Sequence, residues 1–258
     1  MIIDTHIHLD DARYEEDFDA VMERAEAAGV ARFVIPGADS DSLARAVELA
    51  ERYEHIYFAV GIHPYDMEKH DSLDYAAYAN HPKCVAIGEC GLDYYRLEGS
   101  AEEKEAEKHE QQRVFREQIR LARRFRKPLI VHIRDASADS KALLLEEGAA
   151  EVGGVLHCYN ADEQLLSLAG ENFYFGIGGV LTFKNARKLV EVLPKIPMEK
   201  LVVETDGPYL TPHPHRGKRN EPLYVMLVVK KMAELLGMEM EAVAETTTKN
   251  ALKLFNIS

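Results

Sequence analysis

Strand-length apolar runs recur eight times along this chain, and helical patterns separate most of them. The runs are mostly continuous rather than alternating, which is typical of strands buried on both faces of a sheet. The intervals between them leave room for a helix, which favours repeated strand–helix–strand units. The runs occupy residues 2–3, 32–35, 56–60, 84–87, 129–133, 152–156, 173–177 and 201–203.

Apolar residues at helical spacing predict the helices that alternate with these strands. The predicted helices cover residues 17–28, 42–53, 102–125, 136–147, 185–193, 222–236 and 239–255. Eight such units in 258 residues match the size of a single (β/α)8 TIM barrel, so we predict one α/β domain over residues 1–258. A doubly wound open sheet is the alternative. It is disfavoured because no G-x-G-x-x-G pattern follows the first predicted strand.

The composition predicts that the chain folds and that no segment of it spans a membrane. With 47% hydrophobic residues the chain can bury a large core, which argues against disorder. No apolar run approaches the ~20 residues that span a bilayer, and no secretory signal is visible. The three cysteines, Cys84, Cys90 and Cys158, are too few for a disulfide framework, so we expect a cytoplasmic protein.

The net charge of the chain limits the kinds of molecule that it can bind. Lys and Arg total 31 against 44 Asp and Glu, a net charge of −13. Non-specific coating of nucleic acid needs basic residues to neutralise phosphates, so this balance argues against it. No feature indicates an obligate protein partner.

Histidine and carboxylate side chains follow the predicted strands, at the barrel end where active sites lie. Side chains alternate along a strand, so Asp4 should share a face with His6 and His8, and Glu204 should share one with Asp206. We expect six side chains from five strands to converge in the barrel mouth. They are His6, His8, Glu89, His132, His157 and Asp206.

This set favours a metal centre with two divalent ions. A lone histidine at a strand end is more often simply hydrogen-bonded, so the joint pattern carries the argument. A catalytic zinc keeps about three protein ligands, so six ligands suit two ions that share a carboxylate. With no thiolate in the set, Zn, Mg, Mn, Co and Fe all remain open. Asp4 and Glu204 would orient the ligand histidines, or else pair with Arg134 or a helix end.

Other polar residues are candidates for substrate binding. His63 closes the third strand, where it either contacts substrate or caps the turn. Arg134 either binds an anion or pairs with Asp135 or Asp139. A cationic loop after the eighth strand favours anion binding over simple solvation. Its cations are Arg216, Lys218 and Arg219.

The remaining histidines and two of the cysteines receive no role at this stage. Alternation turns Cys90 and Cys158 away from the mouth, as small core residues. The histidines expected at the surface are His55, His70, His81 and His109.

Several sequence blocks resemble the TatD family of metal-dependent deoxyribonucleases. The blocks are long, keep their order and extend over essentially the whole chain. They are residues 4–10 (DTHIHLD), 61–64 (GIHP), 88–95 (GECGLDYY), 128–136 (PLIVHIRDA), 204–210 (ETDGPYL) and 216–222 (RGKRNEP).

The resemblance implies a metal-dependent hydrolase barrel of the amidohydrolase type, in which Glu89 bridges two metals and Asp206 orients or deprotonates the water. It also implies substrate contacts from His63 and residues 216–220. Some members of the family degrade DNA from the 3′ end. The metal ligands it implies are His6, His8, Glu89, His132, His157 and Asp206. One departure affects the turn after the sixth strand, where the family usually has His-Cys-Phe-Ser/Thr-Gly and this chain has residues 157–161 (HCYNA).

We therefore expect a hydrolase that cleaves phosphodiester bonds with metal-activated water, at the end of single-stranded DNA or in another phosphodiester. Asp206 and Glu89 are the expected catalytic residues. An amidohydrolase-like enzyme for a small ester, lactone or amide is the alternative, since the same metals serve either chemistry. A binding module with a structural metal is a third possibility, although structural zinc sites are usually rich in cysteine.

Overall fold

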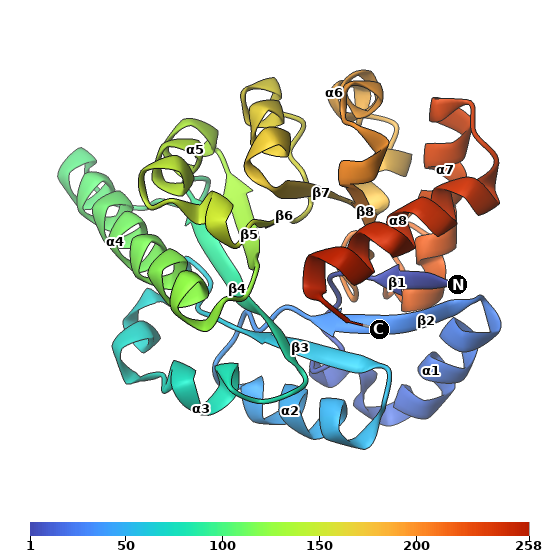
Figure 1. Ribbon diagram of the computed structural model, residues 1–258, viewed down its shortest axis with the longest axis horizontal. Helices are drawn as coiled ribbons and strands as arrows, with labels where there is room; N and C mark the ends of the chain where they lie inside the picture. The colour runs from blue at the N-terminus through green and yellow to red at the C-terminus, as the bar shows by residue number, and fades with distance from the viewer. Residues whose placement is uncertain (258) are drawn as a thin grey trace.

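The computed structural model describes residues 1–257, in which eight parallel strands form a ring (Figure 1). The strands follow one another around the sheet in sequence order, from β1 to β8. A doubly wound sheet reverses its strand order, so this topology excludes that alternative and confirms the predicted barrel. The strands are β1 (Ile2–Asp4), β2 (Val30–Ile35), β3 (Ile56–Val60), β4 (Cys84–Asp93), β5 (Leu129–Arg134), β6 (Gly154–Leu156), β7 (Phe173–Ile177) and β8 (Leu201–Val203).

Helices cover the outside of the ring (Figure 1). Every predicted helix is present, and its ends lie within three residues of the prediction. Short α3 and the 3₁₀ segment η4 were not predicted. The α-helices are α1 (Phe18–Ala27), α2 (Leu43–Arg52), α3 (Tyr75–Ala79), α4 (Ala101–Phe125), α5 (Ser137–Glu146), α6 (Arg187–Val192), α7 (Val225–Leu236) and α8 (Met240–Phe255). The 3₁₀ helices are η1 (Ala12–Asp17), η2 (Met67–Ser72), η3 (Ala149–Glu151), η4 (Glu163–Glu171), η5 (Gly179–Thr182), η6 (Leu193–Lys195), η7 (Met198–Lys200) and η8 (Pro222–Tyr224).

None of the helices found in residues 1–257 combines the length and the apolar character that crossing a membrane requires.

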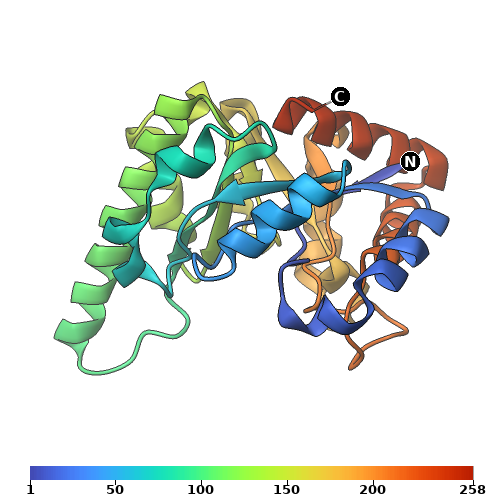
Figure 2. The same cartoon turned by 90° about the horizontal axis from the view of Figure 1, so that it is seen from below.

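The N-terminal end of the barrel is closed by apolar side chains and by α8. Inward-facing residues at this end pack against Leu254 and Phe255 of α8, and all of them are buried. Figure 2 shows α8 across one end of the strands, with the long connecting loops at the other. The inward-facing set includes Ile3, Val34, Ala59, Ala86, Ile130, Val155, Tyr174 and Val202.

The opposite end is tied together where the first and last strands meet. His8 N donates to Gly207 O at 2.8 Å, and Asp206 N donates to His6 O at 2.9 Å. These bonds lie beyond the ends of β1 and β8. They hold the segments that carry His6, His8 and Asp206 side by side at the C-terminal edge of the sheet.

Strand β4 is longer than the predicted residues 84–87, because it continues to Asp93. Its register against β5 shifts between Ile87 and Cys90. The end of the strand is fixed by Gln111 of α4, whose side chain accepts from Asp93 N at 2.8 Å and donates to Asp93 O at 2.9 Å. Glu89 and Asp93 therefore lie on a rigid extension of β4 at the mouth.

Candidate metal centre

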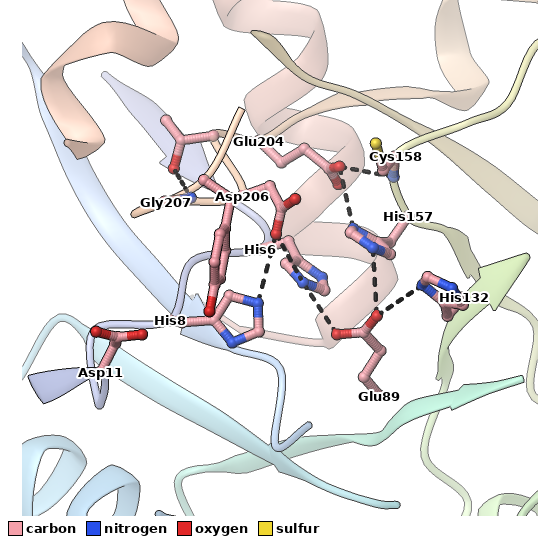
Figure 3. A network of polar contacts seen from close by, with 12 residues as sticks. His6, His8, Asp11, Glu89, His132, His157, Cys158, Glu204, Asp206 and Gly207 are labelled. Carbon is pink, nitrogen blue, oxygen red and sulfur yellow. Dashed lines mark hydrogen bonds and ion pairs between the residues drawn. The ribbon is translucent and has the colours of Figure 1, made fainter. Parts of the chain in front are cut away.

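Buried Glu89 is the centre of a histidine cluster at the barrel mouth (Figure 3). Its Oε1 lies 3.1 Å from His132 Nδ1 and 3.3 Å from His157 Nε2. Its Oε2 lies 3.3 Å from His6 Nε2. His63 Nε2 lies 3.7 Å from Oε1. Four imidazoles from four different strand ends thus surround one carboxylate within the part of the chain that the structure describes.

Asp206 joins this cluster from the end of β8 (Figure 3). Its Oδ1 lies 3.4 Å from His8 Nε2 and 3.7 Å from His6 Nε2. His6 therefore lies between the two carboxylates, and its ring stacks on that of His157 with 3.6 Å between centroids. The structure brings together all the residues predicted to converge: His6, His8, Glu89, His132, His157 and Asp206.

The cluster fits a divalent metal. His6 is 1% exposed, and neither of its ring nitrogens makes a hydrogen bond within residues 1–257. A buried polar atom without a partner is destabilising, and a bound cation would supply that partner. Imidazole nitrogens and carboxylate oxygens, with no thiolate, suit Zn, Mn or Mg. At the mouth, donor atoms within 4.8 Å of one another come from three overlapping groups: His6, His8 and Asp206; His6, Glu89 and His157; His63, Glu89 and His132.

Two further carboxylates contact the ring nitrogens of His132 and His157 that point away from Glu89. His132 Nε2 lies 2.9 Å from Asp93 Oδ2, and His157 Nδ1 lies 3.2 Å from Glu204 Oε1. Each contact fixes which ring nitrogen faces Glu89. The sequence predicts this position for Glu204 and overlooks Asp93. Alternation along β4 from Glu89 would have indicated Asp93, because it stands four residues further on.

Asp4 does not have the orienting position predicted for it. Its carboxylate accepts from Thr205 N at 2.9 Å and from Thr205 Oγ1 at 2.6 Å. Strand β1 ends at Asp4, so strand alternation does not extend to the histidines that follow. Burial raises the pKa of Asp4 to about 8, against the hydrogen bonds from Thr205 that lower it. Asp4 therefore links the ends of β1 and β8 instead of a histidine ring.

The cluster keeps its carboxylates ionised. Burial alone would raise the pKa of Glu89, but His157 and His6 hold it well below its ordinary value. Burial also opposes ionisation of Asp206, but the hydrogen bond to His8 and the charges of His157, His6 and His8 together outweigh it, so the pKa of Asp206 is lowered. For His63 burial dominates and lowers the pKa to about 4. An ionised carboxylate is in the protonation state that binds a cation.

Arg134 lies beside the cluster. Its guanidinium stands over the ring of Tyr95, 3.7 Å from the centroid, and it lines a cavity of about 590 Å³ that begins at His132 and His157. The alternative pairing with Asp135 or Asp139 is not present in the described residues, since Asp139 accepts from Tyr94 Oη at 2.9 Å instead.

The cations of the loop after β8 lie outside the linings of the two cavities that adjoin the cluster. Arg219 forms ion pairs with Asp17 at 2.7 Å and Glu221 at 3.0 Å. Arg216 lies over the ring of Phe183, 3.9 Å from the centroid. Lys218 is exposed on the same loop. The cavities that adjoin the cluster are lined by other cations, so substrate binding by these three residues stays a prediction.

Two expectations about other residues are wrong. His70 is buried, because its Nδ1 lies 2.6 Å from Tyr75 Oη and its Nε2 lies 2.8 Å from Glu117 of α4. Cys158 lines the cavity next to His157, because its backbone has a positive φ of 43° and leaves the strand alternation. Cys90 is in the core, as predicted.

The altered turn after β6 forms part of the same cavity wall. Tyr159 is buried, and its hydroxyl donates to Asp162 O at 2.9 Å. Asn160 Nδ2 donates to Ser137 Oγ at 3.0 Å and so connects the turn to the start of α5. The departure from the family pattern therefore changes the surface of the mouth and leaves His157 in the cluster.

A (β/α)8 barrel with histidines and carboxylates gathered at the C-terminal ends of its strands has the architecture of a metal-dependent hydrolase. The sequence profile of the family described as TatD related DNase matches residues 3–256. The chain belongs to the TatD family, as its sequence blocks indicate.

Individual relatives agree with this assignment. The chain is 45% identical to YabD of Bacillus subtilis (strain 168), an uncharacterized metal-dependent hydrolase, over 100% of both chains. It is 35% identical to the 3′-5′ ssDNA/RNA exonuclease TatD of Escherichia fergusonii, again over 100% of both. The crystal structure of YjjV, a TatD homolog from Escherichia coli K12, superposes with a TM-score of 0.87 at 29% identity, covering 100% of this chain and 98% of that one. The chain is a metal-dependent hydrolase of the TatD type.

Proposed function

We propose that this hydrolase cleaves phosphodiester bonds in single-stranded DNA, starting from the 3′ end. The observation that carries the proposal is a single cluster in which His6, His132 and His157 contact buried Glu89, and His6 and His8 contact Asp206. A relative of the same length that is a 3′-5′ ssDNA/RNA exonuclease supports a nucleic acid substrate. Arg134, next to the cluster, offers a guanidinium that suits a phosphate group.

Two divalent ions, Zn, Mg or Mn, would occupy the cluster, with Glu89 shared between them. The two oxygens of Glu89 face different histidines, Oε2 facing His6 and Oε1 facing His132, which supports a shared carboxylate. When bound, such a pair lowers the pKa of a water molecule and offsets charge on the attacking and leaving oxygens. The proposed ligands are His6, His8, Glu89, His132, His157 and Asp206.

Side chains of the protein would accept the proton, orient the histidine rings and neutralise the phosphate. Asp206 would accept the proton of the attacking water, since its carboxylate borders the cavity that adjoins His132 and His157. Asp93 and Glu204 would keep the rings of these two histidines in one orientation. Arg134 would neutralise the phosphate whose ester bond is cleaved.

We also infer that the enzyme works in the cytoplasm. Its cysteines are free thiols in the described residues, and Cys84 and Cys90 are buried. Free buried thiols agree with a reducing compartment.

The test is a hydrolysis assay on metal-stripped protein that is reconstituted with Mg²⁺, Mn²⁺ or Zn²⁺. The substrates are 5′-labelled single-stranded DNA with a free 3′ end and a panel of esters, lactones and amides. We expect the labelled strand to shorten stepwise with metal and to stay intact with a chelator or with Asp206→Asn. Faster turnover of the ester panel would favour the amidohydrolase alternative. Wild type that cleaves DNA no faster than Asp206→Asn would overturn the proposal.

A further inference from the structure

Two cavities adjoin the cluster, and each is lined by some of the cluster's histidines. One is lined by His8 and His63, from the ends of β1 and β3. The other is lined by His132 and His157, from the ends of β5 and β6. The histidine cluster therefore lies at the boundary between the two cavities.

The first, here the acidic cavity, has a volume of about 620 Å³ and is dominated by carboxylates. Arg45 is the one Lys or Arg among the described residues that line it. Nearby Arg13 pairs with Asp11 at 2.7 Å, and Lys69 pairs with Asp41 at 2.9 Å. Even with these cations counted, carboxylates outnumber them two to one. The lining carboxylates are Asp10, Asp11, Glu15, Asp39, Asp41 and Asp66.

The second, here the basic cavity, has a volume of about 590 Å³ and the opposite charge. Its lining carries Arg96, Arg134 and Lys188. Asp206 is the single carboxylate among the lining residues within 1–257. Arg134 and Arg96 are backed by tyrosine rings, 3.7 Å above Tyr95 and 5.2 Å above Tyr65. A cation backed by a ring is held at a defined position and keeps its donors for an anion.

Tyr209 separates the two cavities, because it lines both. Tyr209 is 47% exposed. Its ring contacts His8 edge-on with 5.8 Å between centroids, and the guanidinium of Arg13 stands over the ring, 4.4 Å from its centroid. Tyr65 and Tyr95, on the basic side, are 37% and 60% exposed. Partly exposed aromatic rings beside a cationic groove are features that bind unpaired bases and their backbone.

We propose that the charge difference between the cavities restricts this enzyme to strand ends. The strand on the 5′ side of the cleaved phosphate lies in the basic cavity, with its phosphates on Arg96 and Lys188, while Arg134 meets the cleaved phosphate itself. The 3′-terminal nucleoside alone enters the acidic cavity. The inference rests on the proposed function and adds the substrate-binding subsites to it.

Electrostatics supply the physical reason. Each nucleotide adds one negative charge, which the basic cavity attracts and the acidic cavity repels. A strand that continued past the cluster would bring its next phosphate among the carboxylates. A terminal nucleoside with a free 3′ hydroxyl has no phosphate there. Repulsion at one position is an effective way to discriminate between ligands that are otherwise alike.

The first experiment tests the basic cavity with the double variant Arg96→Ala/Lys188→Ala. KM for a 5′-labelled oligothymidylate is measured over a range of salt concentrations. The slope of log(1/KM) against log[salt] should become shallower by about 0.7 for each lost phosphate contact. Thermal unfolding of the double variant, compared with that of wild type, shows whether the variant is folded. Arg187→Ala is the matched control, since it removes the neighbouring charge on α6 from outside the cavity lining. An unchanged slope in the double variant would overturn the inference.

The second experiment tests the acidic cavity with strands that differ only in their ends: a 3′-hydroxyl, a 3′-phosphate and a closed circle. Wild type should prefer the 3′-hydroxyl strand on the order of tenfold over the 3′-phosphate and leave the circle intact. The triple variant Asp39→Asn/Asp41→Asn/Asp66→Asn removes the partners of Lys69 and should abolish most of this preference. Its rate on bis(p-nitrophenyl) phosphate shows whether the variant is folded.

Equal wild-type rates on the two linear strands, or an unchanged preference in the folded triple variant, would overturn the inference and leave the proposed function standing. No wild-type hydrolysis of any strand would overturn the proposed function together with the inference.

Discussion

The two ends of the barrel are built from opposite chemistry on the same strands. At the N-terminal end, apolar side chains such as Ile3 and Val202 pack against Leu254 and Phe255 of α8. At the mouth, His6 has ring nitrogens without a hydrogen bond in the described residues. The first arrangement stabilises the fold through burial, and the second leaves polar groups unsatisfied until a cation binds. We therefore expect mutations at the mouth to affect chemistry and mutations at the other end to affect stability.

The largest expected effect is at the mouth. Asp206→Asn should lower kcat on single-stranded DNA by on the order of 10²- to 10⁴-fold, because it removes the proposed proton acceptor. The variant should remain folded, since Asn has the same size as Asp. Steady-state kinetics and thermal unfolding check both halves of this prediction. A variant that unfolds before it loses activity would remove the distinction between the two ends.

The second prediction concerns the opposite end. Phe255→Ala should lower the free energy of unfolding by about 3–5 kcal/mol, because a buried aromatic side chain leaves a cavity beneath α8. The kcat of the folded fraction should stay the same. Urea unfolding measures the loss. Leu145→Ala, at a side chain that is 46% exposed, is the control and should change stability by less than about 0.5 kcal/mol.

A smaller effect is expected behind the cluster. Asp93→Asn and Glu204→Gln should each weaken metal binding by about 10- to 100-fold, because they release the ring of His132 or His157. Asp4→Asn is the matched control, since that buried carboxylate contacts Thr205 and should leave metal affinity alone. Titration of metal-stripped protein, followed by calorimetry, measures all three. Equal losses in the control would show that any buried carboxylate at this end has the same effect.

The smallest effect is expected at the exposed rim of the mouth. The hydrogen bond from Arg219 lowers the pKa of Asp17 from 3.8 to about 2. A lowered pKa stabilises the folded state above the unfolded value of 3.8, and this contribution disappears as the pH falls towards 2. Because Asp17 is partly exposed, the contribution should stay below about 1 kcal/mol. Asp17→Asn should therefore be less stable than wild type at pH 6, with a difference that shrinks below pH 4. A constant difference across this range would exclude the ion pair as its cause.

The sequence predicts the parts of the molecule that depend on local pattern. Continuous apolar runs indicate the strands, and the position of a histidine at or just after the end of such a run is enough to place His132 and His157 at the mouth. Closure of the barrel then brings strand ends together whatever the details of the loops, so the cluster around Glu89 followed from order alone.

The sequence fails where a contact joins distant segments or the backbone leaves its regular pattern. From the sequence alone Arg219 would be taken for a cation without an ion pair, because its partner Asp17 is far away in the chain. Asp4 and Cys158 were misplaced because strand alternation stops beside them. The basic cavity was missed because Arg96 and Lys188 come from loops and helices on different strand–helix units. Neither residue follows a strand directly, so no local signal indicates it.

The metal content of the purified protein tests the central claim most directly. Elemental analysis of wild type, loaded with Mn²⁺ or Zn²⁺ and freed of excess ion, should give two ions per chain. Glu89→Gln should reduce that content, because Glu89 contacts the histidines of both proposed sites. Wild type that retains no ion, or a Glu89→Gln variant that retains as many as wild type, would contradict a metal centre built on Glu89.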